Sequence, residues 1–92
     1  MVDAIRAQIK CSNITVTTSA TAMPTTSLSG RVTMAVRNNG AAVIYLGHAA
    51  VSTANGYPLA AGAEIGLDVG PQVIIYGIVA TGTVDVRILE GA

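Results

Sequence analysis

The side chains best suited to nucleophilic or metal chemistry are few in this chain. Cys11 is its single cysteine and His48 its single histidine. A nucleophile needs a base within hydrogen-bond reach, and a zinc site needs several clustered ligands, so neither residue makes a site alone. We expect Cys11 to be a small buried hydrophobe and His48 to lie on a loop at the surface or at a subunit contact. The sequence therefore predicts no catalytic residue, no cofactor and no metal site, unless symmetry brings copies together at a trimer axis.

The carboxylates show no spacing typical of a glycosidase pair or a calcium loop. They are Asp3, Glu64, Asp68, Asp85 and Glu90. Glu64 and Asp68 fall on the polar face of one expected strand, where solvated charge is the ordinary explanation. The same explanation covers the charged residues on other expected outward faces, namely Arg31, Arg37, Asp85 and Arg87.

The aromatic residues are three tyrosines: Tyr45, Tyr57 and Tyr76. They are too few to form a stacking platform for single-stranded nucleic acid. Large rings bury area that Ala and Val cannot, so packing in the core or at an interface is expected, while sugar binding by one or two of them stays open. We predict Tyr45, His48, Tyr57 and Tyr76 as candidates for a subunit interface.

Composition limits the possible classes of protein. The chain has 92 residues, of which 51% are hydrophobic and 11% charged, and five basic residues balance five acidic ones. This length predicts one domain, residues 1–92, and excludes a multidomain enzyme. Zero net charge argues against nucleic acid or anionic lipid as a partner. The charged fraction is far below the usual ~25%, which favours a subunit of an assembly over a free monomer.

The cysteine count and the pattern of apolar residues predict the cellular compartment. A single cysteine allows no intrachain disulfide, so we expect a reducing compartment. The first residues lack a basic segment followed by an apolar run, and no apolar stretch is long enough to cross a bilayer. We therefore expect no signal peptide and no membrane span.

Residue pattern predicts the elements that must position these side chains. Val, Ile and Thr dominate, and their branched Cβ favours strands over helices. Apolar and polar residues alternate in segments 31–37, 64–69 and 83–89. Two further strands are expected at 42–47, where both faces are apolar, and at 73–79. Turn signals recur about every ten residues, so we predict an all-β fold, a small jelly-roll-like β-sandwich of about seven or eight short strands.

The connections are predicted from their turn residues. Asn38-Asn39-Gly40 is a strong signal for a tight hairpin, because Asn and Gly tolerate positive φ. Residues 1–17 are expected to form an N-terminal strand or arm, as one or two strands. Residues 18–29 are rich in Ser and Thr without a regular apolar period, and an exposed loop is expected there.

The second half of the chain contains short runs of turn and strand residues at close intervals. These are Asn38-Asn39-Gly40, Val43-Ile44-Tyr45-Leu46-Gly47, Val51 to Leu59, Ala61-Gly62, Tyr76-Gly77-Ile78 and Gly82 to Glu90. With these runs, about residues 36–90 resemble small virion proteins of tailed bacteriophages. Residues 1–29 match no pattern of these proteins.

The resemblance implies a capsid decoration, or cement, protein. Such a protein would be a compact homotrimer on the outer face of the capsid, made in the bacterial host cytoplasm, with itself and the major capsid protein as partners. Symmetric repetition would multiply weak contacts into firm attachment and clamp neighbouring capsid subunits against internal pressure. Candidates for capsid contact come from the two irregular segments: Val2, Ile5, Arg6, Lys10, Met23 and Pro24.

Two other classes of function remain open. The first is a tail or head fibre β-module that binds host-surface glycans, which predicts a solvent-exposed rim of His48, Asn55 and Tyr57. The second is a small enzyme, for which the chain lacks an evident set of catalytic residues. Binding to capsids, binding to cells and turnover of a substrate would distinguish the three hypotheses.

Overall fold

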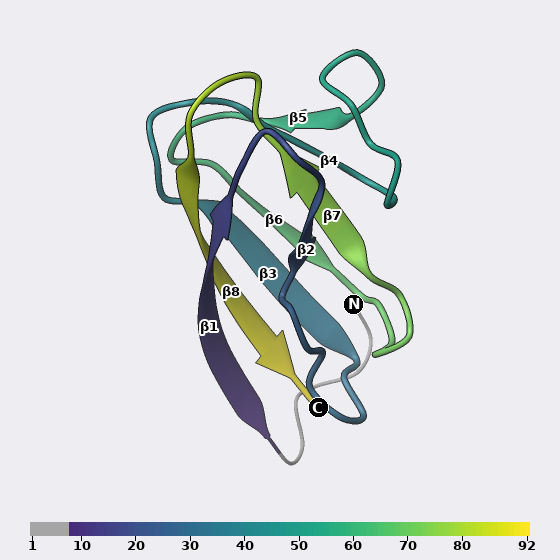
Figure 1. The fold of residues 1–92 in the computed structure, drawn as a ribbon. Coiled ribbons are helices and arrows are strands. Elements are labelled where there is room, and N and C mark those ends of the chain that lie inside the picture. Colours follow the sequence, from purple (N-terminus) through teal and green to yellow (C-terminus); the bar gives the residue numbers. More distant parts are fainter. Residues whose placement is uncertain (1–7) are drawn as a thin grey trace.

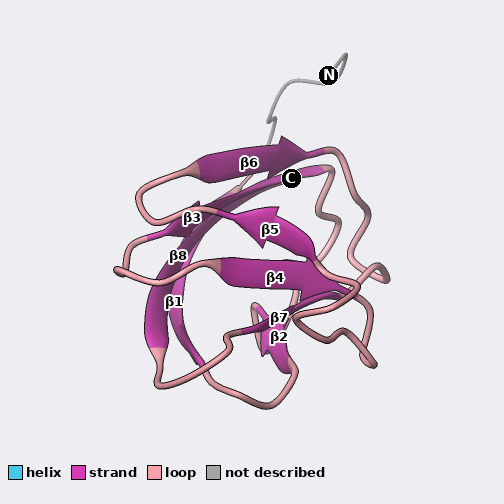
Figure 2. Ribbon diagram, turned by 90° about the horizontal axis from the view of Figure 1, so that it is seen from above, coloured by secondary structure: helices cyan, strands magenta, loops and turns pink. Residues whose placement is uncertain are grey.

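The computed structural model describes residues 8–92, which form eight strands in two four-stranded antiparallel sheets and contain no helix. Sheet A has the order β1 (Ile9–Val16), β8 (Val84–Gly91), β3 (Thr33–Asn38) and β6 (Glu64–Leu67). Sheet B has the order β2 (Thr21–Met23), β7 (Ile75–Ile78), β4 (Ile44–Gly47) and β5 (Tyr57–Leu59). The two sheets are stacked as the layers of a sandwich (Figures 1 and 2).

The connectivity is that of a jelly roll. The chain passes from one sheet to the other at every link except β4 to β5, which are neighbours in sheet B. Strands distant in sequence therefore pair, as in β1 with β8 and β2 with β7. This confirms the predicted fold class, a small all-β sandwich of jelly-roll type.

Alternation of side chains builds the core between the sheets. In β8, Val84, Val86 and Ile88 are buried, while Arg87 and Leu89 face outward. The same period of two holds in β3 and β6, because successive Cβ atoms of a strand point to opposite faces. The buried hydrophobic cluster draws on both sheets: Val16, Met23, Met34, Val36, Ile44, Leu46, Leu59, Val79, Val84, Val86 and Ile88.

The predicted hairpin at Asn38-Asn39-Gly40 is wrong, because the chain crosses there from β3 in sheet A to β4 in sheet B. The buried Asn38 side chain organises the crossing: its amide donates to the carbonyls of Ala42 and Leu59, and its Oδ1 accepts from the Gly40 N–H. Gly40 has no positive φ. A Cβ there would lie 2.7 Å from a Val84 methyl, so close packing explains this glycine.

The N-terminal part of the described chain contributes the first strand of each sheet. β1 is one continuous strand in unbroken register with β8, from Ile9 opposite Gly91 to Val16 opposite Val84. Residues 18–29 are not wholly an exposed loop, since they contain β2. There, Met23 lies in the core and Pro24 follows it through a cis peptide bond, with both side chains buried.

Arg31 does not face outward as predicted. Its side chain is 1% exposed, and its Nη1 lies 2.9 Å from Oε2 of Glu90, which is fully buried. Its other nitrogens donate to the carbonyl oxygens of Val69, Gly70 and Val73. The reason is that the alternation of β8 continues past Ile88 and brings Glu90 inward, where it needs a cationic partner.

Candidate interaction surfaces

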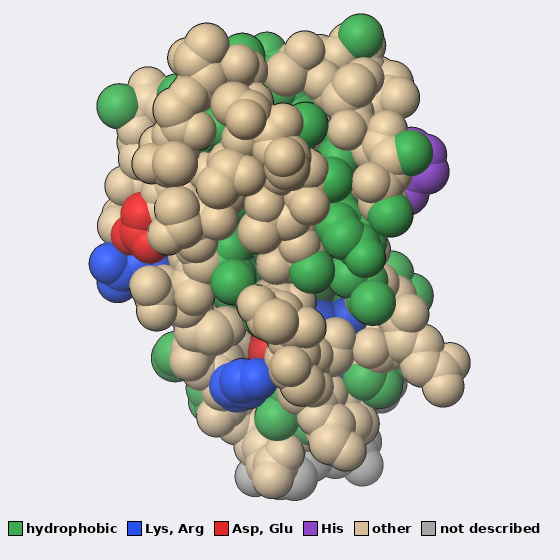
Figure 3. Space-filling model, in the orientation of Figure 1, with side chains coloured by type: hydrophobic (Ala, Val, Ile, Leu, Met, Phe, Trp, Pro, Cys, Tyr) green, Lys and Arg blue, Asp and Glu red, His purple; other side chains and the backbone are tan. Residues whose placement is uncertain are grey.

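Charge is segregated between the two sheets. Every charged residue of the described part lies on a strand of sheet A or within two residues of one: Lys10, Arg31, Arg37, Glu64, Asp68, Asp85, Arg87 and Glu90. The strands of sheet B contain no charged residue. Hydrophobic side chains gather over β7, whereas charged ones lie toward the β8 side and the lower end (Figure 3). The domain therefore presents two chemically different faces.

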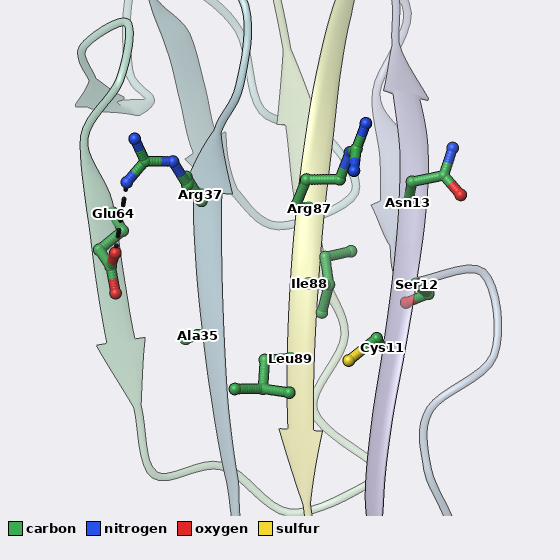
Figure 4. Close-up of a pocket in the computed structure, with 9 residues that line it drawn as sticks. All are labelled: Cys11, Ser12, Asn13, Ala35, Arg37, Glu64, Arg87, Ile88 and Leu89. Atoms are coloured by element: carbon green, nitrogen blue, oxygen red, sulfur yellow. Dashed lines mark ion pairs between the residues drawn. The ribbon is translucent and has the colours of Figure 1, made fainter.

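The outward face of sheet A holds a hollow of about 520 Å³. A polar row crosses all four strands, with Asn13 opposite Arg87, Arg87 opposite Arg37, and Arg37 opposite Glu64. The next row is apolar and, apart from Leu89, made of small residues: Cys11, Leu89, Ala35 and Gly66. Since short side chains lie beside long ones, the second row forms the floor of the hollow and the first forms its rim (Figure 4).

The two arginines of the rim turn away from each other. Arg37 reaches Glu64, with Nη1 3.5 Å from Oε1, and Arg87 donates from Nε to Oδ2 of Asp85 at 2.8 Å (Figure 4 shows the first pair). Hydrogen bonds from the Asn39 amide and from Arg87 lower the pKa of the Asp85 carboxyl below its ordinary 3.8. Arg37 and Arg87 lie directly opposite each other on β3 and β8. Because each guanidinium is drawn to its own carboxylate, the two positive charges are kept apart.

Cys11 is exposed on this face, so its prediction as a buried hydrophobe is wrong. It lines the hollow, whereas His48 follows β4 of the other sheet, and the two potential reactive groups do not meet. Among residues 8–92 no group of three or more His, Cys, Asp or Glu side chains could hold a metal ion.

The outward face of sheet B is uncharged and carries two of the tyrosines. Ile44, Leu46 and Met23 point into the core, so alternation turns their strand neighbours outward. The outward residues are Ala22, Tyr45, Gly47, Pro58, Tyr76 and Ile78. Tyr45 lies opposite Ile78 and Gly47 opposite Tyr76, which makes the two tyrosines diagonal neighbours within reach of each other.

The other two predicted interface residues flank this face. Tyr57 is on the edge strand β5 and 63% exposed, and His48 is exposed in the loop after β4. Near Tyr57 an apolar slot of about 260 Å³ opens between the sheets. It is lined by Leu46, Gly47, Tyr57, Ile65, Leu67 and Ile75. Thus the four predicted residues all belong to the sheet B half of the domain.

The predicted capsid contacts do not form one surface. Val2, Ile5 and Arg6 lie outside the described residues. Lys10 is half-buried in β1, and its Nζ donates to the carbonyl of Thr26 at 2.9 Å. Met23 and Pro24 are buried, which does not fit the contact role expected of them. Sequence reasoning also missed the hollow, although the alternation of β3 and β8 would place Arg37, Arg87 and Leu89 on one face.

The rim predicted by the glycan-binding alternative is exposed. His48, Asn55 and Tyr57 all lie in or beside the loop between β4 and β5, and each is exposed. The loop is internally bonded: Asn55 Oδ1 accepts from the Ser52 N–H at 2.8 Å, and the Gly56 N–H donates to the Ser52 carbonyl. The Asn55 oxygen is therefore already engaged within the loop.

Fold and surfaces together define a small jelly-roll domain with one charged and one uncharged face. The chain matches no protein-family model, and no curated protein is significantly similar to it. Residues 8–92 contain no helix able to cross a membrane.

Proposed function

We propose that this protein is a structural component of a tailed-bacteriophage particle, a decoration protein that binds the outer surface of the capsid. The phage-like runs within residues 36–90 carry the assignment to a virion. The jelly roll supports it, because viral capsid proteins are among the double-sheet jelly rolls. A fold alone does not define a function, so the surfaces have to carry the rest of the argument.

The observation that carries the proposal is that both sheets expose large apolar side chains. Large apolar side chains remain exposed on a domain of only 9.3 kDa, among them Leu89 on sheet A and Tyr57 on sheet B. Exposed apolar groups near a polar rim are typical of protein–protein contacts. A protein with such surfaces on both sides is suited to sit within an assembly.

We assign the capsid contact to the hollow of sheet A. Its floor of Cys11, Leu89 and Ala35 offers apolar area, and its rim of Arg37 and Arg87 offers guanidinium groups. Arginine is favoured at interfaces because its fork binds carboxylates in a fixed geometry. A capsid surface carrying carboxylates beside an apolar side chain would match this face.

Co-sedimentation with undecorated capsids tests the proposal, with host cells as a parallel arm. We expect the protein to pellet with capsids and not with cells. Leu89→Asp places a charge on the floor and should weaken capsid binding by about tenfold or more. Thr81→Asp, a matched change in an exposed loop outside the hollow, should leave binding unchanged.

Two results would contradict the proposal. The first is a wild-type protein that ignores capsids. The second is a protein that pellets with host cells alone, which would favour a glycan-binding fibre module, supported by the exposed His48, Asn55 and Tyr57. A Tyr57→Ala variant distinguishes a decoration protein from a glycan-binding fibre module. It should abolish the cell binding of a fibre module, whereas capsid binding through sheet A should stay intact.

A further inference from the structure

We infer that two copies of this chain pair along the free edge of β1, antiparallel and about a two-fold axis at Ser12, so that their A sheets join into one eight-stranded sheet. β1 is the outermost strand of sheet A, and β8 pairs with its inner side (Figure 1). The pairing does not depend on the proposed function, and only its consequence for attachment to capsids rests on it.

The backbone pattern identifies the free groups of β1. Gln8 and Ala92 exchange both backbone hydrogen bonds, with N···O distances of 3.0 and 2.9 Å. Such pairs alternate in an antiparallel ladder, so even-numbered residues of β1 bond to β8 and odd-numbered ones point their N–H and C=O groups away from it. These odd-numbered residues are exposed: Ile9, Cys11, Asn13 and Thr15. None of their backbone groups bonds to another residue within 8–92.

β1 differs from the other three edge strands of the sandwich. β2 and β5 have three residues each and β6 has four. Pro58 lies within β5, Pro24 directly follows β2, and Glu64 begins β6. Short length, proline and charge are the usual means by which proteins keep sheet edges from pairing. β1 has eight residues, no proline and an unbroken register with β8, and the Nζ of its one charged residue, Lys10, is bound to the Thr26 carbonyl.

The spacing of the free groups requires an extended strand as the occupant. Donors and acceptors recur at every second residue, about 7 Å apart along the strand, which matches the ladder of another β-strand. A second copy of β1 supplies the same groups at the same spacing. In the antiparallel register that places Ile9 opposite Thr15 and Cys11 opposite Asn13, the N–H and C=O groups of all four residues find a partner.

Ser12 favours a second copy in this register. Its Oγ is buried and has no hydrogen-bond partner in the described part of the chain. The register places Ser12 opposite its own copy in a non-hydrogen-bonded pair, where side chains come closest. A turn about the Cα–Cβ bond lets the two hydroxyls bond to each other across the strands. A foreign strand with an apolar residue at this position would leave the buried hydroxyl unpaired.

The same register separates the charges of the two edges. Lys10 lies opposite Ile14 of the second copy, so the two Lys10 residues are about 13 Å apart along the strands. This distance exceeds the screening length of ~10 Å at moderate salt. Repulsion between the copies is therefore weak.

The pairing has a consequence for attachment to capsids. A two-fold axis perpendicular to the joined sheet turns the outward faces of both A sheets to the same side. The two hollows, each lined in part by Cys11 and Asn13, then lie on either side of the paired strands. Two such sites on one face can bind neighbouring capsid subunits, and the second contact forms at a high effective concentration.

Sedimentation velocity tests the pairing, over a concentration series reaching about 200 µM, well above the dissociation constant on the order of 10 µM that a small contact along one strand edge predicts. Asn13→Pro removes an N–H that β8 does not use, and it should raise the dissociation constant by about tenfold or more. Asn13→Ala is the matched control, because it removes the same side chain but keeps the N–H. Its dissociation constant should stay within about twofold of wild type.

Oxidative cross-linking in a Cys11→Ser background tests the register. Ser12→Cys places two thiols across the axis at a Cα separation of about 4.5 Å, which a disulfide spans. Copper-catalysed oxidation by air should therefore link the two copies. Asn13→Cys is the control, because its two Cα atoms lie diagonally, about 8 Å apart, which is too far for a disulfide.

Thr15→Pro is a second variant if Asn13→Pro does not fold, and Thr15 does not line the hollow. A wild-type monomer at the highest concentration, a trimer, a dimer that a folded proline variant leaves intact, or cross-linking of Asn13→Cys in place of Ser12→Cys would each overturn the inference. A dimer that ignores capsids would refute the proposed function alone, and a monomer that binds capsids would refute this inference alone.

Discussion

Replacing Arg31 by Ala tests how much stability the buried ion pair provides. The guanidinium joins β8 to the segment after β6, because it donates to Oε2 of Glu90 at 2.9 Å and to the carbonyls of Val69, Gly70 and Val73 at 3.2, 2.7 and 2.6 Å. The substitution leaves the Glu90 carboxylate buried without a countercharge.

The expected loss follows from burial. Removing one partner of a buried ion pair costs about 3–5 kcal/mol, because the remaining charge stays in a medium of low polarity. Domains of this size have a total free energy of unfolding on the order of 5–14 kcal/mol. Arg31→Ala should therefore remove a large share of the stability.

The assay is urea unfolding followed by circular dichroism at neutral pH. The midpoint should fall while the slope with denaturant stays constant. Arg37→Ala is the matched control: it also removes an arginine from an ion pair, but Arg37 is 51% exposed and 3.5 Å from Glu64. Exposed pairs contribute about 0–1 kcal/mol, so the control should barely change the midpoint.

Equal losses in the two variants would refute the reasoning. If Arg31→Ala does not fold, Arg31→Lys provides the measurement. A lysine keeps the charge but lacks the planar fork that reaches several acceptors at once. We expect a stability between those of wild type and Arg31→Ala, and a lysine variant as stable as wild type would contradict the importance of these bonds.

Three further changes test the crossing between β3 and β4. Asn38→Ala should lower the free energy of unfolding by about 1–3 kcal/mol in the same urea assay, because buried carbonyls lose their donor, and an unchanged midpoint would contradict this. Gly40→Ala should cost about 1–3 kcal/mol by crowding Val84, which thermal unfolding would detect and which an unchanged melting temperature would exclude. Asn39→Ala should raise the Asp85 pKa toward 3.8 in an NMR titration. Because the folded pKa is lowered in the wild type, the stabilisation is present above pH 3.8 and is lost as the pH falls through the folded pKa, so Asn39→Ala should lose less stability on acidification.

Regular alternation made the strands predictable. In segment 83–89 the apolar residues recur at every second position, and β8 buries those positions. The same reasoning extends by one more step to Glu90, which the pattern places inward. A buried carboxylate requires a partner, but sequence spacing does not reveal that Arg31 supplies it, since the two residues meet only when β3 and β8 pair.

Turn residues were less informative than strand residues. Asn38-Asn39-Gly40 has the composition of a tight hairpin, yet Asn38 uses its side chain to bridge Ala42 and Leu59 while the chain changes sheets. A hairpin and a crossing begin with the same residue types, and only the pairing of distant strands distinguishes them. The location of β2 within residues 18–29 depends in the same way on its pairing with β7.

The candidate surfaces were predictable in part. The size of the tyrosine rings predicts that they pack in the core or at an interface. The structure places Tyr45 and Tyr76 together on sheet B. The pairing that joins them belongs to strands separated by about thirty residues of chain, which local patterns do not encode. The hollow of sheet A arises similarly, from four strands whose order follows from the topology and not from their sequence order.

The pairing of β1 with β8 has a consequence for how the domain folds and unfolds. Ile9 lies opposite Gly91, so the two strands meet only when almost the whole described chain has been drawn together. Contacts between residues so far apart in sequence slow folding. Among the described strands, β8 is the only one that pairs with β1, so a disruption of β8 also frees β1 and removes two of the four strands of sheet A at once.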